Sequence, residues 1–340
     1  MNNNRILLAI FILLGTATGW YLYRGSQGPD TSLGWDRKFK VDNPDEIGKI
    51  FIAKRTGETT TIERAGTGWI VNGQHKASPN AVENLLEAVT QVELKFVPPV
   101  KAIENLGREL AARGIKVEVY DRRNRLLKAY YVGGVTPDAR GTVMLMENAD
   151  QPMVVEIPQM EGQIRTRYDL TGDKWRDRTV FGYPNPDRIR RISVEYPQQR
   201  NKSFVLDREN KGFSVRPFYD NVPTLDRPVS PANVEAYLFQ FRSLMAEAFE
   251  NEMTGKDSIR QTIPFARISV TEIDGILRTA TLFPTYRNDA FTGERPTDIV
   301  ERYYADLNTG DWMLVQHHVF QKIFWPYEAL LEPPGEDIKH

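Results

Sequence analysis

The chain has 340 residues, long for one domain and suited to about two domains of ~150 residues each. It is 41% hydrophobic and 26% charged, a balance that supports packed cores and excludes a disordered tail or a polytopic membrane protein. Its net charge of −1 gives no basic field for nucleic acid, and the absence of cysteine excludes disulfides and thiolate sites.

The first predicted element is a transmembrane anchor over residues 6–23, after a short cytoplasmic tail at residues 1–5. The stretch lies between Arg5 and Arg24 and contains no charged residue. A helix of its eighteen residues spans about 27 Å, just enough for a bilayer core. Its apolar and interfacial side chains include Ile6, Leu7, Leu8, Phe11, Leu13, Leu14, Trp20 and Tyr21.

A cleaved signal peptide is the alternative interpretation of this stretch. It is disfavoured because bulky Trp20 and Tyr21 closely follow the best cleavage position, after Ala17. We therefore expect membrane lipid to contact the anchor of a single-pass protein in the cytoplasmic (inner) membrane. The very short tail favours a periplasmic location for the remainder, although the flanking basic residues do not decide the orientation. Residues 24–39 then form a spacer.

An internal duplication is the most informative feature of the remaining chain. Ser78-Pro79 recurs as Ser230-Pro231, 152 positions later, and each pair matches a helix start with serine as N-cap and proline at the first helical position. Apolar residues with helical spacing follow both pairs. They are Val82, Leu85, Leu86, Val89 and Val92 in the first copy and Val234, Tyr237, Leu238, Phe241 and Leu244 in the second.

Strand signals flank both helices. Upstream, Glu63-Arg64 before Gly68-Trp69 matches Asp207-Arg208 before Gly212-Phe213, as in hairpins with glycine-containing turns. Downstream, Val117 and Val119 alternate with polar residues, as do Ile268 and Val270. The predicted fold class is α+β: after the transmembrane helix come two tandem, similar units of mainly antiparallel sheet with one long amphipathic helix each.

The predicted boundaries follow from these matches. The first repeat covers residues 40–158, an inter-repeat joint covers residues 159–186, and the second repeat covers residues 187–323. An aromatic segment with a polar tail completes the chain at residues 324–340.

Two aromatic stretches are candidates for partner binding. In the joint, Trp175 can act as an apolar anchor while Arg176 and Arg178 donate to a partner's carboxylates or to a glycan. The structural alternative, which we favour, has Trp175 and Phe181 packing on the cores of the two repeats. In the C-terminal segment, Phe324, Trp325 and Tyr327 pose the same choice, and closure of the core is again favoured.

The chain contains none of the common catalytic signatures. Phosphate-binding and dinucleotide-binding glycine motifs, the G-x-S-x-G nucleophile motif and the H-E-x-x-H zinc motif are missing from the sequence. No metal, cofactor or catalytic residue is predicted, and the protein is interpreted as a non-enzyme.

Several motifs together carry a family resemblance. They are Ile47-Gly48-Lys49-Ile50-Phe51-Ile52, Gly68-Trp69-Ile70-Val71-Asn72-Gly73, Gly114-Ile115-Lys116-Val117-Glu118-Val119-Tyr120, Tyr130-Tyr131-Val132-Gly133-Gly134, residues 175–181 and Val194-Glu195-Tyr196-Pro197-Gln198-Gln199. The chain resembles membrane-anchored bacterial (Bacteroidetes-type) proteins with a duplicated α+β domain of unknown function, found near ABC-type gliding-motility auxiliary components. The resemblance runs from the anchor to about Glu332. It implies an envelope location among other envelope proteins and brings no catalytic residues.

The leading functional hypothesis is a membrane-anchored periplasmic scaffold or accessory subunit that docks on an envelope membrane complex. Its partners would be other envelope membrane proteins, and nucleic acid is not expected. This hypothesis predicts a contiguous exposed apolar patch. The alternative is a module that binds envelope glycan or a small ligand, with Trp69 among the aromatic residues available for stacking. An unfamiliar hydrolase is a third, weaker possibility.

Overall fold

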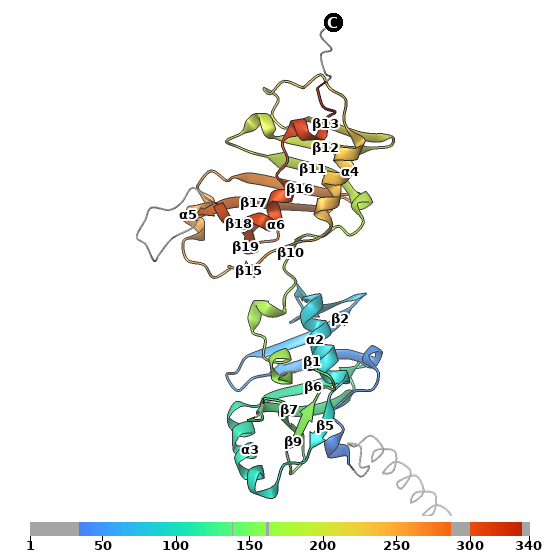
Figure 1. The fold of residues 1–340 in the computed structure, drawn as a ribbon, viewed down its shortest axis with the longest axis vertical. Helices are drawn as coiled ribbons and strands as arrows, with labels where there is room; N and C mark the ends of the chain where they lie inside the picture. Colours follow the sequence, from blue (N-terminus) through green and yellow to red (C-terminus); the bar gives the residue numbers. More distant parts are fainter. Residues whose placement is uncertain (1–33, 138, 161–162, 287–299, 335–340) are drawn as a thin grey trace, which may run out of the picture. The chain divides into compact units, whose positions relative to one another are not determined.

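The chain divides into two compact units, Met1–Asp177 and Arg178–His340, each described here by itself (Figure 1). The computed structural model describes residues 34–137, 139–160, 163–286 and 300–334. The predicted anchor at residues 6–23, its preceding tail and most of the spacer lie outside these residues. Within the described ranges, no helix is both long and apolar enough to cross a membrane.

Unit 1 is built on one antiparallel sheet with strand order β4-β3-β2-β1-β6-β7-β8-β9-β5. Its strands and longer helices are β1 (Ile47–Ala53), β2 (Thr59–Ala65), β3 (Gly68–Val71), β4 (His75–Lys76), α2 (Pro79–Thr90), β5 (Glu93–Phe96), α3 (Val100–Arg113), β6 (Ile115–Asp121), β7 (Leu126–Val135), β8 (Thr142–Met146) and β9 (Met153–Glu156). Short 3-10 helices include η1 (Trp35–Arg37), η2 (Pro44–Glu46), η3 (Ile164–Arg167) and η4 (Gly172–Trp175).

The two longer helices of unit 1 cover opposite faces of this sheet. In β8, Met144 belongs to the main core beneath α2, whereas its neighbour Val143 packs with Leu110 of α3. Successive side chains of a strand point to opposite faces, so the alternation separates the two layers. The prediction of one long helix is therefore wrong for unit 1. The prediction missed helix α3, although Ile103, Leu106 and Leu110 stand at helical spacing in its sequence.

Unit 2 repeats the design with a sheet of order β13-β12-β11-β16-β17-β18-β19-β15. Its elements are β10 (Thr179–Phe181), η5 (Pro186–Arg188), β11 (Ile189–Glu195), η6 (Arg200–Lys202), β12 (Phe204–Glu209), β13 (Gly212–Pro217), α4 (Pro231–Phe239), η7 (Gln240–Arg242), β14 (Leu244–Met245), β15 (Ala248–Phe249), α5 (Lys256–Arg260), β16 (Ala266–Glu272), β17 (Leu277–Tyr286), β18 (Val300–Leu307), β19 (Trp312–Gln316), α6 (His317–Phe320), η8 (Gln321–Ile323) and η9 (Tyr327–Leu330). Strands β10 and β14 form a separate two-stranded sheet.

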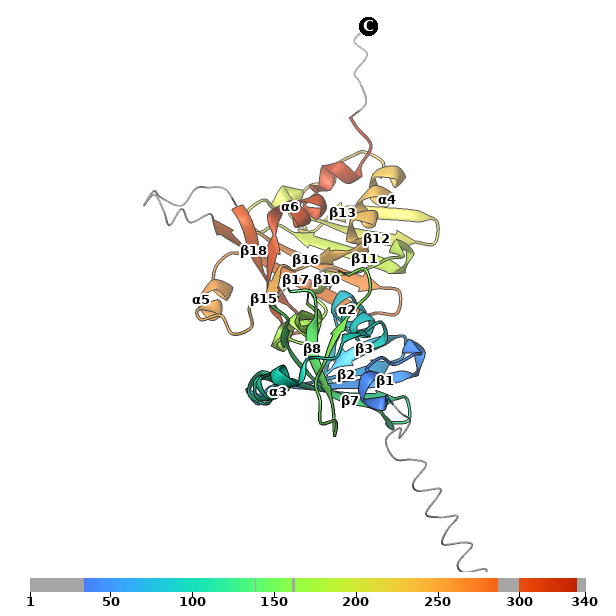
Figure 2. The ribbon, with the colours of Figure 1, turned by 60° about the horizontal axis from the view of Figure 1, so that its bottom comes forward.

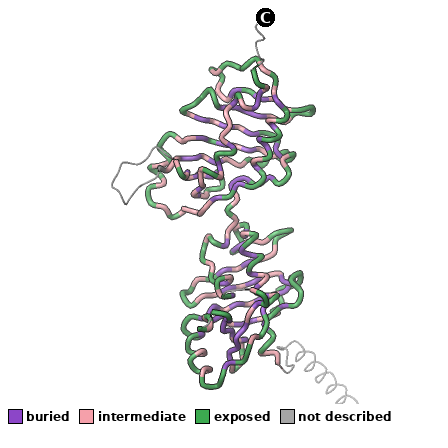
Figure 3. The backbone as a smooth tube through the Cα atoms, viewed as in Figure 1, coloured by how far each residue is buried: buried purple, intermediate pink, exposed green. Residues whose placement is uncertain are grey.

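Helices α4 and α6 cover one face of the unit 2 sheet, and the short helix α5 lies at the other, where Arg260 contacts Trp312 and pairs with Asp306. Figures 1 and 2 show α4 and α6 on the same side of the strands, and both contribute to one continuous core. In Figure 3 the buried residues run through the strands of each unit, while the turns are exposed. The predicted sheet-rich α+β class with antiparallel pairing is confirmed.

The two sheets match strand for strand. The unit 2 sheet has the same strand order as the unit 1 sheet without its edge strand β4. Reading across the sheets, β13, β12, β11 and β16 take the places of β3, β2, β1 and β6, and β17, β18, β19 and β15 take the places of β7, β8, β9 and β5. The pairing even contains the same irregularity, because the register shifts between Ile47 and Lys49 in β1 and between Ile189 and Arg191 in β11. A β-bulge at the same place in both sheets is a feature of the fold rather than an accident.

An Asn-Pro-Asp turn that the sequence comparison missed precedes both bulges. Asn43 and Asn185 each accept a hydrogen bond from the backbone N–H two residues later, at 2.9 and 3.0 Å. An arginine on the next strand then holds the turn against the sheet. The Nε atom of Arg64 donates to the Ile47 carbonyl at 2.8 Å, and that of Arg208 donates to the Ile189 carbonyl at 3.1 Å.

Both helix starts lie where the sequence places them. Ser78 is the N-cap of α2 and accepts a hydrogen bond from the Ala81 N–H at 3.4 Å, and Ser230 occupies the same position before α4. The second helix is shorter than predicted and tightens into η7 after Phe239. The carbonyl of Phe241, in η7, accepts the Tyr183 N–H at 3.0 Å, a bond outside the helix.

The repeats end later than predicted. The Ser78 N–H donates to the Trp175 carbonyl at 2.8 Å, and the Ser230 N–H donates to the Leu330 carbonyl at 2.9 Å. In each unit the final 3-10 turn, η4 or η9, therefore returns to the start of the helix. The predicted joint at residues 159–186 is divided between the two units, and the predicted C-terminal segment completes unit 2.

We predict that Trp175→Ala destabilises unit 1 by about 3–5 kcal/mol, because it removes a fully buried indole from the core. Hydrogen exchange with mass spectrometry should show faster exchange throughout the strands of unit 1 and unchanged exchange in unit 2. Lys174→Ala, an exposed neighbour, is the control. Wild-type exchange in the Trp175→Ala variant would contradict the closing role of this turn.

Candidate functional site

The predicted binding residues of the joint lie mostly inside unit 1. Trp175 is fully buried in the core, and its indole Nε1 donates to the Leu170 carbonyl at 3.0 Å. The Arg176 guanidinium donates to Asp173 at 2.9 Å and is nearly buried. Arg178 begins unit 2 and donates to the Glu247 backbone carbonyl. Trp175 thus has no exposed surface for a partner, and its prediction as a partner-binding anchor is wrong.

The C-terminal aromatic residues complete the core of unit 2. Tyr327 is buried, and Phe324 and Trp325 are half-buried. The ring of Phe324 meets that of Phe265 edge-on with centroids 4.9 Å apart, and the Trp325 ring lies 5.4 Å from that of Tyr237. Phe181 of the former joint lies in the same core. In both aromatic stretches, therefore, the rings pack in or against the cores of the two units.

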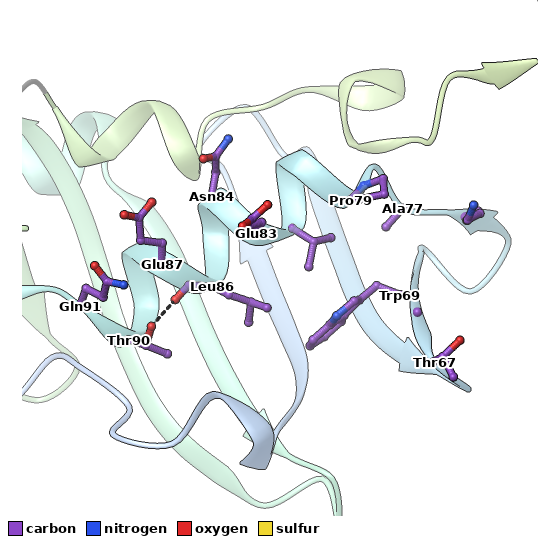
Figure 4. A pocket seen from close by; sticks show the side chains of 13 residues that line it. Thr67, Trp69, Ala77, Pro79, Glu83, Asn84, Leu86, Glu87, Thr90 and Gln91 are labelled. Atoms are coloured by element: carbon purple, nitrogen blue, oxygen red, sulfur yellow. Dashed lines mark hydrogen bonds between the residues drawn. The ribbon is translucent and has the colours of Figure 1, made fainter. Parts of the chain in front are cut away.

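A cleft on unit 1 is formed between helix α2 and the hairpin of β3 and β4. Its volume is about 790 Å³, and we call it the Trp69 cleft after the aromatic residue on its floor (Figure 4). Val82, Leu86 and Trp69 supply apolar surface, with Leu86 and Trp69 half-buried. The Arg64 guanidinium lies 4.7 Å from the centroid of the Trp69 ring and holds the indole in place.

Polar groups surround this apolar floor. Glu83 and Asn84 are exposed on α2, Gln91 is exposed directly after it, and Thr67 is exposed on the β2–β3 turn. Other polar groups of the cleft are engaged within the protein: Glu87 pairs with Arg167, the Thr90 hydroxyl donates to the Leu86 carbonyl at 2.8 Å, and Lys76 pairs with Asp177 at 2.7 Å. The cleft thus combines a fixed aromatic ring with carboxylate, amide and hydroxyl groups.

An exposed apolar feature lies on unit 2, at the turn between β16 and β17. Ile273, Ile276 and Leu277 expose 57, 57 and 52% of their surfaces within five residues of chain. We call residues 273–277 the apolar turn. The equivalent turn of unit 1, between β6 and β7, carries Arg122, Arg123, Asn124, Arg125 and Leu126 instead. The repeats therefore present different chemistry at the same position of the fold.

Ion pairs at its base hold the apolar turn in one conformation. The Arg188 guanidinium donates to Glu272 at 2.9 Å and to Asp274 at 2.8 Å. The backbone carbonyl of Arg188 also accepts the Ile273 N–H at 2.9 Å, and Gly275 supplies the positive φ of 87° that the turn requires. The aliphatic side chains are consequently displayed on a preorganised hairpin end.

Titratable groups in the described residues act mainly as ion-pair partners. The Arg302 guanidinium hydrogen-bonds Glu247 and holds the pKa of that carboxyl below its usual range. The Arg125 backbone N–H does the same for the pKa of Asp121. Among described residues, no group of three His, Asp or Glu side chains has the geometry to hold a metal ion.

Comparison with known proteins identifies one family. The family described as Domain of unknown function (DUF4340) matches residues 69–261, more than half of the chain. The chain belongs to this family. The match begins at Trp69 in β3 and ends just after α5, so it includes parts of both repeats. No curated protein and no solved structure matches the chain.

Neither site was found from the sequence. The Trp69 cleft has a partial signal in Trp69 itself, an aromatic residue available for stacking, but the sequence does not show that polar residues of α2 surround this ring. The apolar turn has a clearer signal, because Ile273 and Ile276 stand where the first repeat has Arg122 and Arg125. Aligning the two repeats turn by turn would have shown this difference.

We predict that Arg188→Ala loosens the apolar turn while changing the free energy of unfolding by less than about 1 kcal/mol, because the ion pairs lie near the surface. Residues 273–277 should exchange amide hydrogens faster, and unit 1 should be unchanged. Arg123→Ala, an exposed arginine on the equivalent turn of unit 1, is the control. Unaltered exchange at residues 273–277 would show that Arg188 does not order the turn.

Proposed function

We propose that the protein is a non-enzymatic, membrane-anchored periplasmic protein that docks on an envelope membrane complex as a scaffold or accessory subunit. Residues 6–23 would anchor it in the cytoplasmic membrane. The Bacteroidetes-type setting and the neighbourhood of ABC-type gliding-motility auxiliary components, which the sequence resemblance implies, are part of this proposal. The apolar turn of unit 2 is the observation that carries it.

The apolar turn has the properties of a protein contact. Isolated exposed aliphatic side chains are common, but three within five residues at a rigid hairpin end form a patch. Fully burying one such side chain is worth about 1.5–3 kcal/mol relative to leaving it exposed. The turn is already ordered by Arg188, so a partner that covers it loses little binding free energy to ordering.

The difference between the repeats supports the same interpretation. The fold does not require the two isoleucines at this turn, because unit 1 has Arg122 and Arg125 in the places of Ile273 and Ile276 and shares only a leucine, Leu126 in the place of Leu277. Side chains that are exposed and not needed by the fold are better explained by contact with another molecule. The patch is also smaller than a stable interface needs, which is typical of the central contact in a larger docking surface.

We predict that the double variant Ile276→Asp, Leu277→Asp loses its membrane partners. The tagged full-length protein would be extracted in mild detergent, cross-linked and analysed by mass spectrometry. Recovery of partners should fall at least about tenfold, because placing charges in a desolvated contact costs more than ~1.4 kcal/mol.

Leu126→Asp, on the equivalent turn of unit 1, is the matched control and should retain the partners. Recovery of the wild-type protein alone, from extracts in which other membrane complexes survive, would overturn the accessory-subunit proposal. Full retention of partners by the double variant would show that the apolar turn is not the docking contact.

A second candidate function, binding of an envelope glycan, is favoured by the Trp69 cleft. Sugar rings present an apolar face that stacks on an indole and hydroxyl groups that bond to carboxylate and amide side chains. The cleft supplies a half-buried Trp69 and the exposed polar groups of Glu83, Asn84 and Gln91. Its volume of about 790 Å³ lies within the range of small-molecule sites.

We predict that soluble glycan-strand fragments of peptidoglycan bind the full-length protein in detergent and that Trp69→Ala weakens binding about tenfold or more, as truncation of an aromatic anchor does. Isothermal titration calorimetry measures the change. Phe213→Ala is the matched control, since Arg208 covers Phe213 in unit 2 as Arg64 covers Trp69. Equal affinities of the wild-type protein and Trp69→Ala would exclude the cleft as the glycan site.

A further inference from the structure

A second exposed apolar patch lies on unit 1, where β5 leads into α3. Val100 exposes 82% and Phe96 45% of its surface, and Leu94 and Val97 are also exposed. The segment from Leu94 to Lys101 reads Leu-Lys-Phe-Val-Pro-Pro-Val-Lys, with two lysines and no acidic residue. We call residues 94–101 the β5–α3 patch.

The patch is exposed because of where the fold places it. Strand β5 is the last strand of the unit 1 sheet and pairs only with β9 in the strand order, so one of its sides faces away from the sheet. Helix α3 packs on the sheet through Leu110, near its C-terminal end, whereas Val100 is its first residue. The side chains of Leu94, Phe96, Val97 and Val100 therefore belong to neither layer of the core.

The patch adjoins the segment where the described chain begins. The Val41 N–H donates to the carbonyl of Val89, at the end of α2, at 3.0 Å. The Lys40 ammonium lies 4.0 Å from the carboxylate of Glu93, the residue directly before the patch. Figure 1 shows β5 beside the blue segment that opens the described part of unit 1.

The length of chain before this segment limits its distance from the predicted anchor. The anchor ends at Tyr23 and the described chain begins at Gly34. Eleven residue steps reach at most about 40 Å when fully extended. The β5–α3 patch thus lies within reach of the surface of any bilayer that holds residues 6–23.

We propose that the β5–α3 patch is a membrane-contact surface, which places Phe96 and Val100 in the interface of the bilayer and the ammonium of Lys101 among anionic lipid headgroups. Aliphatic and aromatic side chains flanked by lysines are the composition of surfaces that bind this interface. The inference rests on the anchor of the proposed function but not on the docking of a partner. Its consequence is that unit 1 lies against the membrane beside its own anchor.

The absence of cysteine makes a direct test possible in the full chain. Phe96→Cys and Val100→Cys would each be labelled with an environment-sensitive fluorophore, and the protein would be reconstituted in phosphatidylglycerol-containing vesicles with spin-labelled lipids. We expect several-fold greater quenching by these lipids at both positions than at Thr67→Cys. Thr67 is exposed on the β2–β3 turn, towards the opposite edge of the same sheet, and is the matched control.

The possible outcomes separate the membrane contact of the patch from the presence of the anchor. Equal quenching at positions 67, 96 and 100 in protein that floats with the vesicles would overturn the membrane contact and leave the anchor intact. Protection of the label at position 100 from an aqueous quencher, without quenching by lipid, would assign the patch to a protein contact and also overturn it. Failure of the protein to float with the vesicles would overturn the anchor itself. Stronger lipid quenching in anionic than in zwitterionic vesicles would support the role of Lys101.

Discussion

The fold of each unit depends on a backbone hydrogen bond between its end and the start of its main helix. The Ser78 N–H reaches the Trp175 carbonyl in unit 1, and the Ser230 N–H reaches the Leu330 carbonyl in unit 2. These donors belong to helix N-caps, where a buried N–H without a partner would cost free energy. The same closure inserts Trp175 into the unit 1 core and Leu330 into the unit 2 core. One contact therefore satisfies the helix start and completes the core.

This closure also explains why the aromatic residues that look most like binding anchors in the sequence are structural. A tryptophan near two arginines in a segment without clear periodicity resembles an exposed site for partner binding. As the last residue of η4, Trp175 instead points its indole inward, where the indole N–H donates to the Leu170 carbonyl. A buried indole whose N–H has a partner contributes its full apolar surface to stability. What remains exposed in each unit is the chemistry of turns and sheet edges.

Much of the architecture could be predicted from the sequence because it rests on local signals. Ser-Pro helix starts and strands such as β6, with Val117 and Val119 facing the core, read correctly. Two features could not be found in this way. The ends of the repeats depend on long-range backbone hydrogen bonds, which leave no residue pattern. The exposure of Phe96 and Val100 depends on β5 being the last strand of its sheet, and sequence periodicity does not report strand order.

The duplication separates what the fold needs from what it tolerates. Features present in both units, such as the Asn-Pro-Asp turn, the bulge after it and the arginine that fastens it, are requirements of the architecture. Features present in one unit alone are free to serve another purpose. By this criterion Ile273 and Ile276 of the apolar turn stand apart, since the equivalent turn of unit 1 has arginines at these two positions. The stacked ring on β3 meets the criterion only in part, because Phe213 repeats the packing of Trp69 beneath an arginine. What distinguishes the Trp69 cleft is therefore less its ring than its α2 rim, where Glu87 stands in place of the exposed Phe239 of α4.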